Sequence, residues 1–265
     1  MNTATMAPET TQVEWQKRRM HHVFAADGRA VVVAMDHGIT WGVVPGLIDV
    51  KAAVRSVVAG GADAVMTTLG MGRAVSGSLG RTGWIMVLDS ERSVAGYGVE
   101  AAIHAGADAV ELKVFPGSTS DEKLGELREL AAQATAVGLP LMAEAIPVSF
   151  TDTEAHTVEN IANAARICAE AGADFVKVPF ASTADRYRSV IDGTFVPILV
   201  LGGSLQKEPV AALELAAAAM ASGARGVVFG RNVFQAADPE RMVAALCEVV
   251  HGGASVAQAK RLLER

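Results

Sequence analysis

The most chemically suggestive residue of the sequence is a single lysine within a short apolar run. Lys177 lies in the run FVKV at residues 175–178, between a Gly-Ala-Asp sequence and a proline. Short apolar runs with such boundaries are typical of strands that are covered on both faces of a parallel sheet. Burial lowers the pKa of a lysine and frees its amine to attack a carbonyl carbon, as Schiff-base catalysis requires. The alternative is a lysine that extends to solvent or pairs with a carboxylate.

Three acidic residues and a second lysine lie in or directly after other predicted strands. Asp36 ends the first strand, where it could act as a base, hold the reactive lysine or cap the next loop. Glu111 and Lys113 alternate to one face of the fourth strand, toward either the interior of the fold or its outer helices. From the interior, Lys113 could lower the pKa of Lys177 further; otherwise it is expected to pair with Glu111. Glu144 on the fifth strand is a candidate for proton transfer, or a structural partner of either lysine.

Glycine turns follow the seventh and eighth predicted strands. The first is Gly202-Gly203-Ser204, and the second is Gly230-Arg231, which opens a short helix. Glycines allow backbone amides to approach an anion closely, a helix N-terminus favours negative charge, and arginine can clamp phosphate oxygens. The two turns together predict a phosphate site, although each could be a tight turn alone.

These positions depend on a regular alternation of short apolar runs and longer helical patterns. Eight strands alternating with helices predict a closed parallel (β/α)8, or TIM, barrel, whose active site lies at the C-terminal ends of its strands. The predicted strands are residues 30–35, 64–67, 84–88, 109–114, 141–146, 175–178, 197–201 and 226–229. The predicted helices are residues 50–59, 94–105, 121–137, 158–171, 209–221, 239–250 and 256–263. The 265 residues are expected to form a single barrel domain, with residues 1–16 as a flexible segment.

A short repeat supports this arrangement. Residues 61–63, 106–108 and 172–174 each have the sequence Gly-Ala-Asp and precede an even-numbered strand. The glycine is expected to end a helix, and the aspartate to open the next strand. These turns belong to the N-terminal face of the barrel, so a structural role is predicted for them.

Composition excludes several other classes of protein. The net charge is -6 and no stretch is strongly basic, so nucleic acid is not an expected partner. No apolar run is long enough to span a membrane, and residues 1–16 lack the apolar core of a signal peptide, so a cytoplasmic location is expected. Cys168 and Cys247 have no metal-ligand spacing and are expected to be free thiols.

His37 points away from Asp36 along its strand and is expected to be a structural hydrogen-bonding residue.

Four motifs together resemble a known family. They are MDHG at residues 35–38, FVKVP at 175–179, GGS at 202–204 and FGRNVFQ at 229–235. In combination they resemble the archaeal-type class I fructose-bisphosphate aldolases. The wider group includes deoxyribose-phosphate aldolase, tagatose-bisphosphate aldolase and an amino-dideoxy-heptulosonate synthase. The resemblance extends from about residue 19 to residue 250, and its motifs are specific for the group rather than for one substrate.

The resemblance implies roles for particular residues. Lys177 would form the Schiff base, and Asp36 would assist proton transfer and position the lysine or the substrate. The phosphate of the substrate would be bound by Gly203, Ser204, Gly230 and Arg231. Such enzymes need no metal and no cofactor, because the protonated imine is the electron sink. They also tend to form ring-like homo-oligomers.

One departure from the family pattern limits the substrate. The fructose-bisphosphate enzymes carry an acid/base tyrosine just before a proline at the end of strand five, and this sequence has Ile146 there. Glu144 resembles the strand-five glutamate of the tagatose-bisphosphate branch. Lys113 stands where the side chain is usually uncharged or a histidine. These differences argue against fructose 1,6-bisphosphate cleavage by the standard arrangement and indicate a specialised aldolase.

Three functions follow as hypotheses. The first is a metal-independent aldolase that acts on a phosphorylated ketose, with dihydroxyacetone phosphate as the ketone and with Lys177, Asp36, Glu144 and Lys113 as catalytic residues. The second is a synthase or transaldolase of the amino-dideoxy-heptulosonate type. The third is a barrel that binds a sugar phosphate without catalysis. Contacts to the aldehyde are expected from loops 40–47, 68–78 and 149–154, in which Arg73, with Arg81 nearby, could bind a second anion or be a solvated charge.

Overall fold

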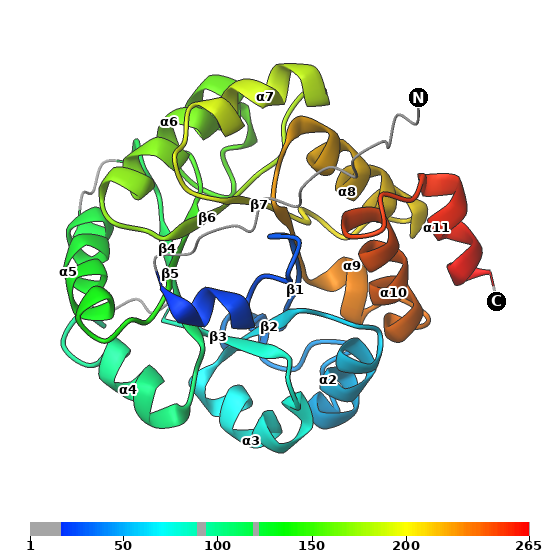
Figure 1. Ribbon diagram of the computed structural model, residues 1–265, viewed down its shortest axis with the longest axis horizontal. Helices are drawn as coiled ribbons and strands as arrows, with labels where there is room; N and C mark the ends of the chain where they lie inside the picture. Colours follow the sequence, from blue (N-terminus) through cyan, green and yellow to red (C-terminus); the bar gives the residue numbers. More distant parts are fainter. Residues whose placement is uncertain (1–16, 89–93, 119–121, 265) are drawn as a thin grey trace, which may run out of the picture.

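Eight parallel strands form a closed barrel, which confirms the predicted (β/α)8 architecture. The computed structural model describes residues 17–88, 94–118 and 122–264. Each strand pairs with the next, and the first also pairs with the last (Figure 1). The strands are β1 (Ala30–Ala34), β2 (Ala64–Thr68), β3 (Gly83–Val87), β4 (Ala109–Val114), β5 (Leu141–Ala145), β6 (Phe175–Val178), β7 (Ile198–Leu201) and β8 (Gly226–Phe229).

Helices surround the barrel on its outer side (Figure 1). The main helices are α2 (Val50–Ala59), α3 (Leu69–Leu79), α4 (Gly98–Ala105), α5 (Glu122–Ala136), α6 (Val158–Glu170), α7 (Ala184–Asp192), α8 (Val210–Ser222) and α10 (Pro239–Val250). Short helices are α1 (Gly38–Trp41) and α9 (Arg231–Phe234), with 3-10 turns η1 (Arg18–His22) and η2 (Thr153–Ala155). The C-terminal α11 (Val256–Leu263) packs against α8 and α10. None of the described helices has the length and apolar character needed to cross a membrane.

The list of predicted helices is wrong in three places, one of which is α7 at residues 184–192, where no helix was predicted. Residues 68–78 were expected to be a loop, but α3 occupies most of this range. Its glycines lower the intrinsic helix propensity, yet Gly72 is required by tertiary packing, since a Cβ there would lie 1.9 Å from Cζ2 of Trp84. The helix predicted from residue 94 begins only at Gly98. The segment predicted to be flexible, residues 1–16, lies outside the described residues.

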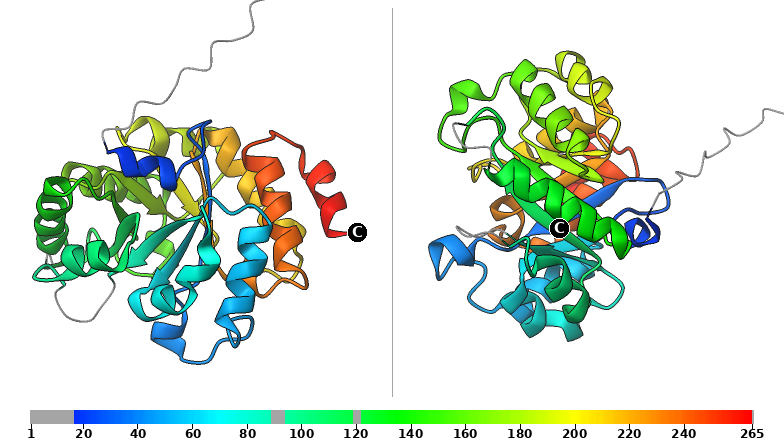
Figure 2. Two further views of the ribbon diagram at one scale, coloured as in Figure 1. Left: turned by 60° about the horizontal axis from the view of Figure 1, so that its bottom comes forward. Right: turned by 90° about the vertical axis from the view of Figure 1, so that its left-hand side faces the viewer.

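The barrel interior has its own apolar core, separate from the larger core between the strands and the helices. Its members face inward at alternate positions of the strands, as Val32, Met142 and Phe175 do. Residues that follow η1 close one end of this core, where the ring of Phe24 packs edge-on against Phe175 at 5.4 Å. In both views of Figure 2, η1 lies at one end of the barrel and α1 at the other. Because the residues after η1 close one end of the barrel, the active site is expected at the other end, near α1.

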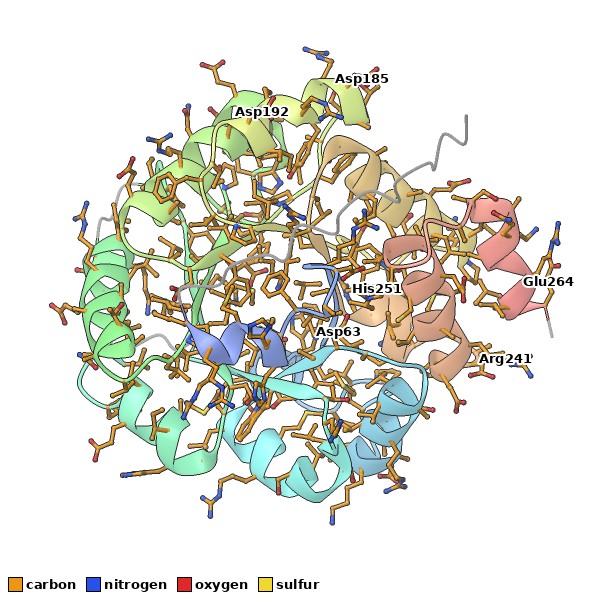
Figure 3. All side chains as sticks on the ribbon, viewed as in Figure 1. Asp63, Asp185, Asp192, Arg241, His251 and Glu264 are labelled. Carbon is orange, nitrogen blue, oxygen red and sulfur yellow. The ribbon has the colours of Figure 1, made fainter. Side chains whose placement is uncertain are left out.

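The Gly-Ala-Asp turns make the structural contacts that their position predicts. The carboxylates of Asp63, Asp108 and Asp174 each accept a hydrogen bond from the backbone N–H of a residue in or next to the preceding strand. Each also pairs with a basic side chain, as Asp174 does with Lys17 at 2.7 Å. His251 lies beside Asp63 in Figure 3 and contacts it at 3.0 Å. These contacts join the N- and C-terminal segments to the closed end of the barrel.

Candidate active site

Lys177 is the third residue of β6 and faces the barrel interior. Phe175, two residues earlier, belongs to the interior core, and strand alternation gives Lys177 the same orientation. Only 6% of Lys177 is exposed. Its Nζ lies 2.7 Å from Oε1 of Glu144 on β5, a residue that is 4% exposed. The lysine therefore does not extend to bulk solvent, and its counter-ion is as deeply buried as the amine.

The strand register places three charged residues side by side. Lys113 of β4 is paired in register with Glu144, and Glu144 is paired with Lys177. Glu144 therefore stands between two lysines, and of these it forms its ion pair with Lys177. The Nζ of Lys113 lies 5.6 Å from the ring centroid of Phe150, in the loop that follows β5. Glu111 and Lys113 of β4 therefore face the barrel interior rather than the outer helices.

Glu111 lies deeper in the barrel, two residues before Lys113 on the same face of β4. It is completely buried, and within the described part of the chain neither carboxyl oxygen has a hydrogen-bond partner. Desolvation, followed by the nearby charge of Glu144, raises the pKa of Glu111 well above its usual range. Burial therefore disfavours the charged form of this carboxyl group, which lies deeper in the barrel than the ion pair.

The pKa of Lys177 shifts in the opposite direction to the prediction. Desolvation alone lowers this pKa, but the charges of Glu144, Glu111 and Asp36 raise it, as does the hydrogen bond with Glu144, and the net shift is upward. Of the alternatives that the sequence left open, a lysine paired with a carboxylate is observed, and this counter-ion outweighs the effect of burial. Lys177 is consequently an ammonium, and it must pass a proton to a neighbour before its lone pair can attack a carbonyl.

Asp36 and His37 follow β1 at the open end of the barrel. Asp36 continues the inward alternation of Val32 and Ala34, and its charge influences the pKa of Lys177. Burial, with the charges of Lys177 and Arg231, lowers the pKa of His37 despite the opposing effect of Asp36. Within the described residues the Nδ1 of His37 has no hydrogen-bond partner, so the ring packs rather than bonds through that atom.

The two glycine turns are joined by a residue that sequence reasoning did not assign. The side-chain amide of Asn232 donates to the carbonyl oxygens of Gly202 (3.0 Å) and Ser204 (3.1 Å) and accepts from the N–H of Gln206 (2.8 Å). Asn232 therefore fixes the turn after β7 against the turn after β8. Its place beside Arg231 was visible in the sequence, but its partners, about 30 residues away, were not.

Free hydrogen-bond donors gather at these turns. Gly203 has a φ of +66°, which favours glycine, and in the described structure its N–H and that of Ser204 have no acceptor. The Nε of Arg231 is buried and likewise lacks an acceptor among the described residues. The guanidinium of Arg231 stacks on the ring of Trp41, with Cζ 5.0 Å from the ring centroid. Such a group of N–H donors suits an anion with several oxygens.

The position at which the fructose-bisphosphate aldolases have an acid/base tyrosine is occupied by Ile146 in this chain. Ile146 is fully buried directly after β5 and continues the inward alternation of Glu144. Of the two tyrosines in the chain, Tyr187 is buried and donates its hydroxyl to the carbonyl oxygen of Pro179 at 2.6 Å. Desolvation raises its pKa, and Tyr97 is exposed at the start of α4. The end of β5 therefore carries the carboxyl group of Glu144 and no tyrosine hydroxyl.

Two arginines remain from the sequence candidates, and they lie on different elements. Arg73 is exposed on α3, and Arg81 precedes β3, which places it at the N-terminal ends of the strands. Arg81 is thus on the wrong face for a substrate contact. Within the described residues, no group of three or more His, Cys, Asp or Glu side chains is arranged to hold a metal ion.

A buried lysine and glutamate at the open end of a (β/α)8 barrel, beside glycine turns and an arginine, form the arrangement of a barrel aldolase. Comparison with known families agrees with this class. The model of the DeoC/LacD family aldolases matches residues 30–236, and the chain belongs to this family. It is therefore an enzyme of the aldolase type, as the sequence motifs predicted.

Individual relatives support the same assignment. The chain is 35% identical over 239 residues to the 2-amino-3,7-dideoxy-D-threo-hept-6-ulosonate synthase of Halobacterium salinarum, across 87% of this chain and 89% of that protein. It is 30% identical to an uncharacterized aldolase of Saccharolobus solfataricus, across 89% and 95% of the two chains. Among solved structures, a Schiff-base-forming fructose-1,6-bisphosphate aldolase has a TM-score of 0.78 and 27% identity, across 88% of this chain and 98% of the other.

Proposed function

We propose that this enzyme forms or cleaves a carbon–carbon bond of a phosphorylated keto compound through a Schiff base on Lys177. The observation that carries the proposal is the 2.7 Å contact between Nζ of Lys177 and Oε1 of Glu144, with both groups buried. A buried amine in contact with a group that can accept its proton is what imine chemistry needs. The phosphate would be held by the free donors of Gly203, Ser204 and Arg231, with Gly202 and Gly230 shaping the turns.

The residues suggest an order of proton transfers. The ammonium of Lys177 passes a proton to the carboxylate of Glu144, and the neutral amine adds to the ketone carbon to form a carbinolamine. Glu144 returns this proton to the carbinolamine hydroxyl, which leaves as water and yields an iminium ion. Lys113, on the other side of Glu144 in the strand register, supports its negative charge whenever the proton has left.

Cleavage then uses the iminium ion as the electron sink. A carboxylate, Glu144 or Asp36, removes the proton of the substrate hydroxyl, and the adjacent carbon–carbon bond breaks. Its electrons form an enamine on Lys177, and an aldehyde leaves. Protonation of the enamine carbon and addition of water release the phosphorylated ketone and regenerate the amine. The reverse sequence is a condensation, and both directions balance without a metal or a redox partner.

Two substrate assignments are compatible with this scheme. The first is a ketose phosphate whose ketone component is dihydroxyacetone phosphate. The second is synthesis of the amino-dideoxy-heptulosonate type, and the 35% identity to two synthases of that name favours it. Ile146 also favours the second over fructose 1,6-bisphosphate cleavage, since the tyrosine of the standard arrangement is replaced. A soluble, ring-like homo-oligomer in the cytoplasm is part of the proposal, and light scattering of the purified protein would measure the assembly.

Borohydride reduction tests the proposed chemistry. We expect incubation with dihydroxyacetone phosphate or a related keto phosphate to leave a stable adduct on the peptide that contains Lys177. Lys177→Met should abolish the adduct, whereas Lys113→Met should retain it, because only Lys177 is placed as the nucleophile. Adduct on Lys113, or activity of Lys177→Met, would contradict the mechanism. Binding of the phosphate without any adduct would instead identify a non-catalytic barrel.

Product analysis separates the two substrate assignments. The enzyme would be supplied with one keto phosphate and a panel of aldehydes, with and without an amino group. Selective formation of an amino-keto product would support the synthase. Efficient release of dihydroxyacetone phosphate from a ketose phosphate would support the first assignment.

A further inference from the structure

The loop after β1 carries an exposed tryptophan that contacts the arginine of the candidate phosphate site. Trp41 is 54% exposed at the end of α1, and its ring faces the guanidinium of Arg231. We propose that Trp41 is a positioning residue, which holds the Arg231 guanidinium toward the phosphate group of a keto substrate. This inference rests on the proposed function for the identity of the anion.

Several contacts hold this loop against the turn that follows β8. The His37 ring lies between the rings of Trp41 and Phe234, with centroid distances of 5.4 and 5.1 Å. Gly230 leaves the room for this ring, because a Cβ there would lie 2.4 Å from Cε1 of His37. The position of Trp41 is therefore set by a row of three rings that begins on α9.

A second set of contacts anchors the far end of the loop to the same turn. The side-chain amide of Gln235 donates to the carbonyl oxygen of Pro45 at 3.0 Å. Gly46 packs directly on the backbone of Phe234, since a Cβ there would lie 2.2 Å from that carbonyl oxygen. The loop is thus attached on both sides of Trp41, and the tryptophan is held over Arg231 although it is exposed.

Arg231 depends on this stacking because other restraints are few. Its Nε has no hydrogen-bond partner among the described residues, and its contact of known geometry there is the one with the ring of Trp41. A flexible arginine would lose conformational freedom each time it bound a phosphate. Stacking on an aromatic ring restricts the guanidinium plane while leaving its N–H edge available. Trp41 therefore prepares the arginine for an anion without using its donors.

Substitution of Trp41 tests the proposal against a matched control on the same loop. Trp41→Leu should raise the KM of the keto phosphate about 3- to 30-fold, the range expected from loss of a cation–π contact, with a much smaller change in kcat. Trp41→Phe should keep most of the affinity, since a ring remains. Ile48→Ala removes another apolar side chain of this loop, 78% exposed and outside residues 40–47, and should leave both constants unchanged. An unchanged KM in Trp41→Leu would overturn the proposal. A fall in kcat by the same factor as the rise in KM would also overturn it.

A binding measurement separates this inference from the proposed catalysis. Titration calorimetry with inorganic phosphate needs no turnover, and Trp41→Leu should weaken phosphate binding by a similar factor. Thermal unfolding of each variant reports whether it is folded. If wild type binds phosphate but forms no borohydride adduct, the catalytic proposal fails and the role of Trp41 stands. If the adduct forms but Trp41→Leu binds phosphate as wild type does, the role of Trp41 fails alone.

Discussion

The buried ion pair leads to a prediction about both activity and pH-dependent stability. Glu144→Gln keeps the size of the side chain but removes the charge that faces Nζ of Lys177 at 2.7 Å. Burial then acts on the lysine without its nearest counter-ion, so the pKa of Lys177 should fall instead of rising. Removal of one partner from a buried pair costs about 3–5 kcal/mol of folding stability at neutral pH, because an uncompensated charge remains.

The direction of the pH effect follows from the two pKa shifts. In wild type the folded pKa of Lys177 is raised, so the stabilisation is complete below the unfolded value of about 10.4 and is lost only above it. In Glu144→Gln the folded pKa lies below the unfolded one, and the unfolded chain binds more protons. The stability of the variant should therefore approach that of wild type as the pH rises from about 7 to about 9.

Denaturant unfolding and steady-state kinetics would test these expectations together. The kcat of Glu144→Gln should fall by about 10²–10⁴-fold, the usual effect of removing a general acid–base group. Glu214→Gln, at an exposed site on α8, is the matched control and should behave as wild type. A variant that keeps kcat within a few fold and has the same stability deficit at both pH values would refute the reasoning.

Three further predictions concern other parts of the barrel. Glu111→Met should raise the free energy of unfolding by about 1–3 kcal/mol in urea, because it removes a buried carboxyl without hydrogen-bond partners; destabilisation would contradict this. The hydrogen bond to Asp63, with that to Asp27, raises the pKa of His251 from 6.5 to about 9, so the bridge stabilises the fold fully below about pH 6.5 and is lost as the pH rises through about 9. His251→Leu should therefore be about 1–2 kcal/mol less stable than wild type near pH 6 and equal near pH 10 in thermal unfolding, and a constant gap would argue against the assignment. Gly230→Ala should displace the His37 ring and raise the KM of a phosphorylated substrate. Gly203→Ala has open space around its Cβ, so it should leave the KM unchanged and cost only about 1 kcal/mol of stability because of its positive φ. Equal KM values for the two variants would contradict this prediction.

The barrel was predictable because its strands are marked locally. Runs such as residues 109–114 and 226–229 are apolar, short and bounded by turn residues, and their bounds agree with β4 and β8. The third helix was missed for the opposite reason. Its glycines argue against a helix locally, and only the approach of Trp84 explains why Gly72 is there.

The site was predictable in its members but not in its electrostatics. Lys177, Glu144 and Asp36 could be assigned to one end of the barrel, since all C-terminal strand ends meet there. Neither the partner of Glu144 nor the raised pKa of Glu111 could be derived, because both depend on which side chains meet across neighbouring strands. The catalytic roles of these residues, with those of Lys113 and the glycine turns, stay predictions.

The sequence by itself determined the barrel, its open end and the residue types available for chemistry, because periodicity and turn residues act over short stretches of chain. The tertiary structure decided the charge of Lys177, the isolation of Glu111 and the stacking of Trp41 on Arg231. These properties arise between groups that are far apart in the chain, where burial and nearby charges oppose each other and only the distances show which is stronger.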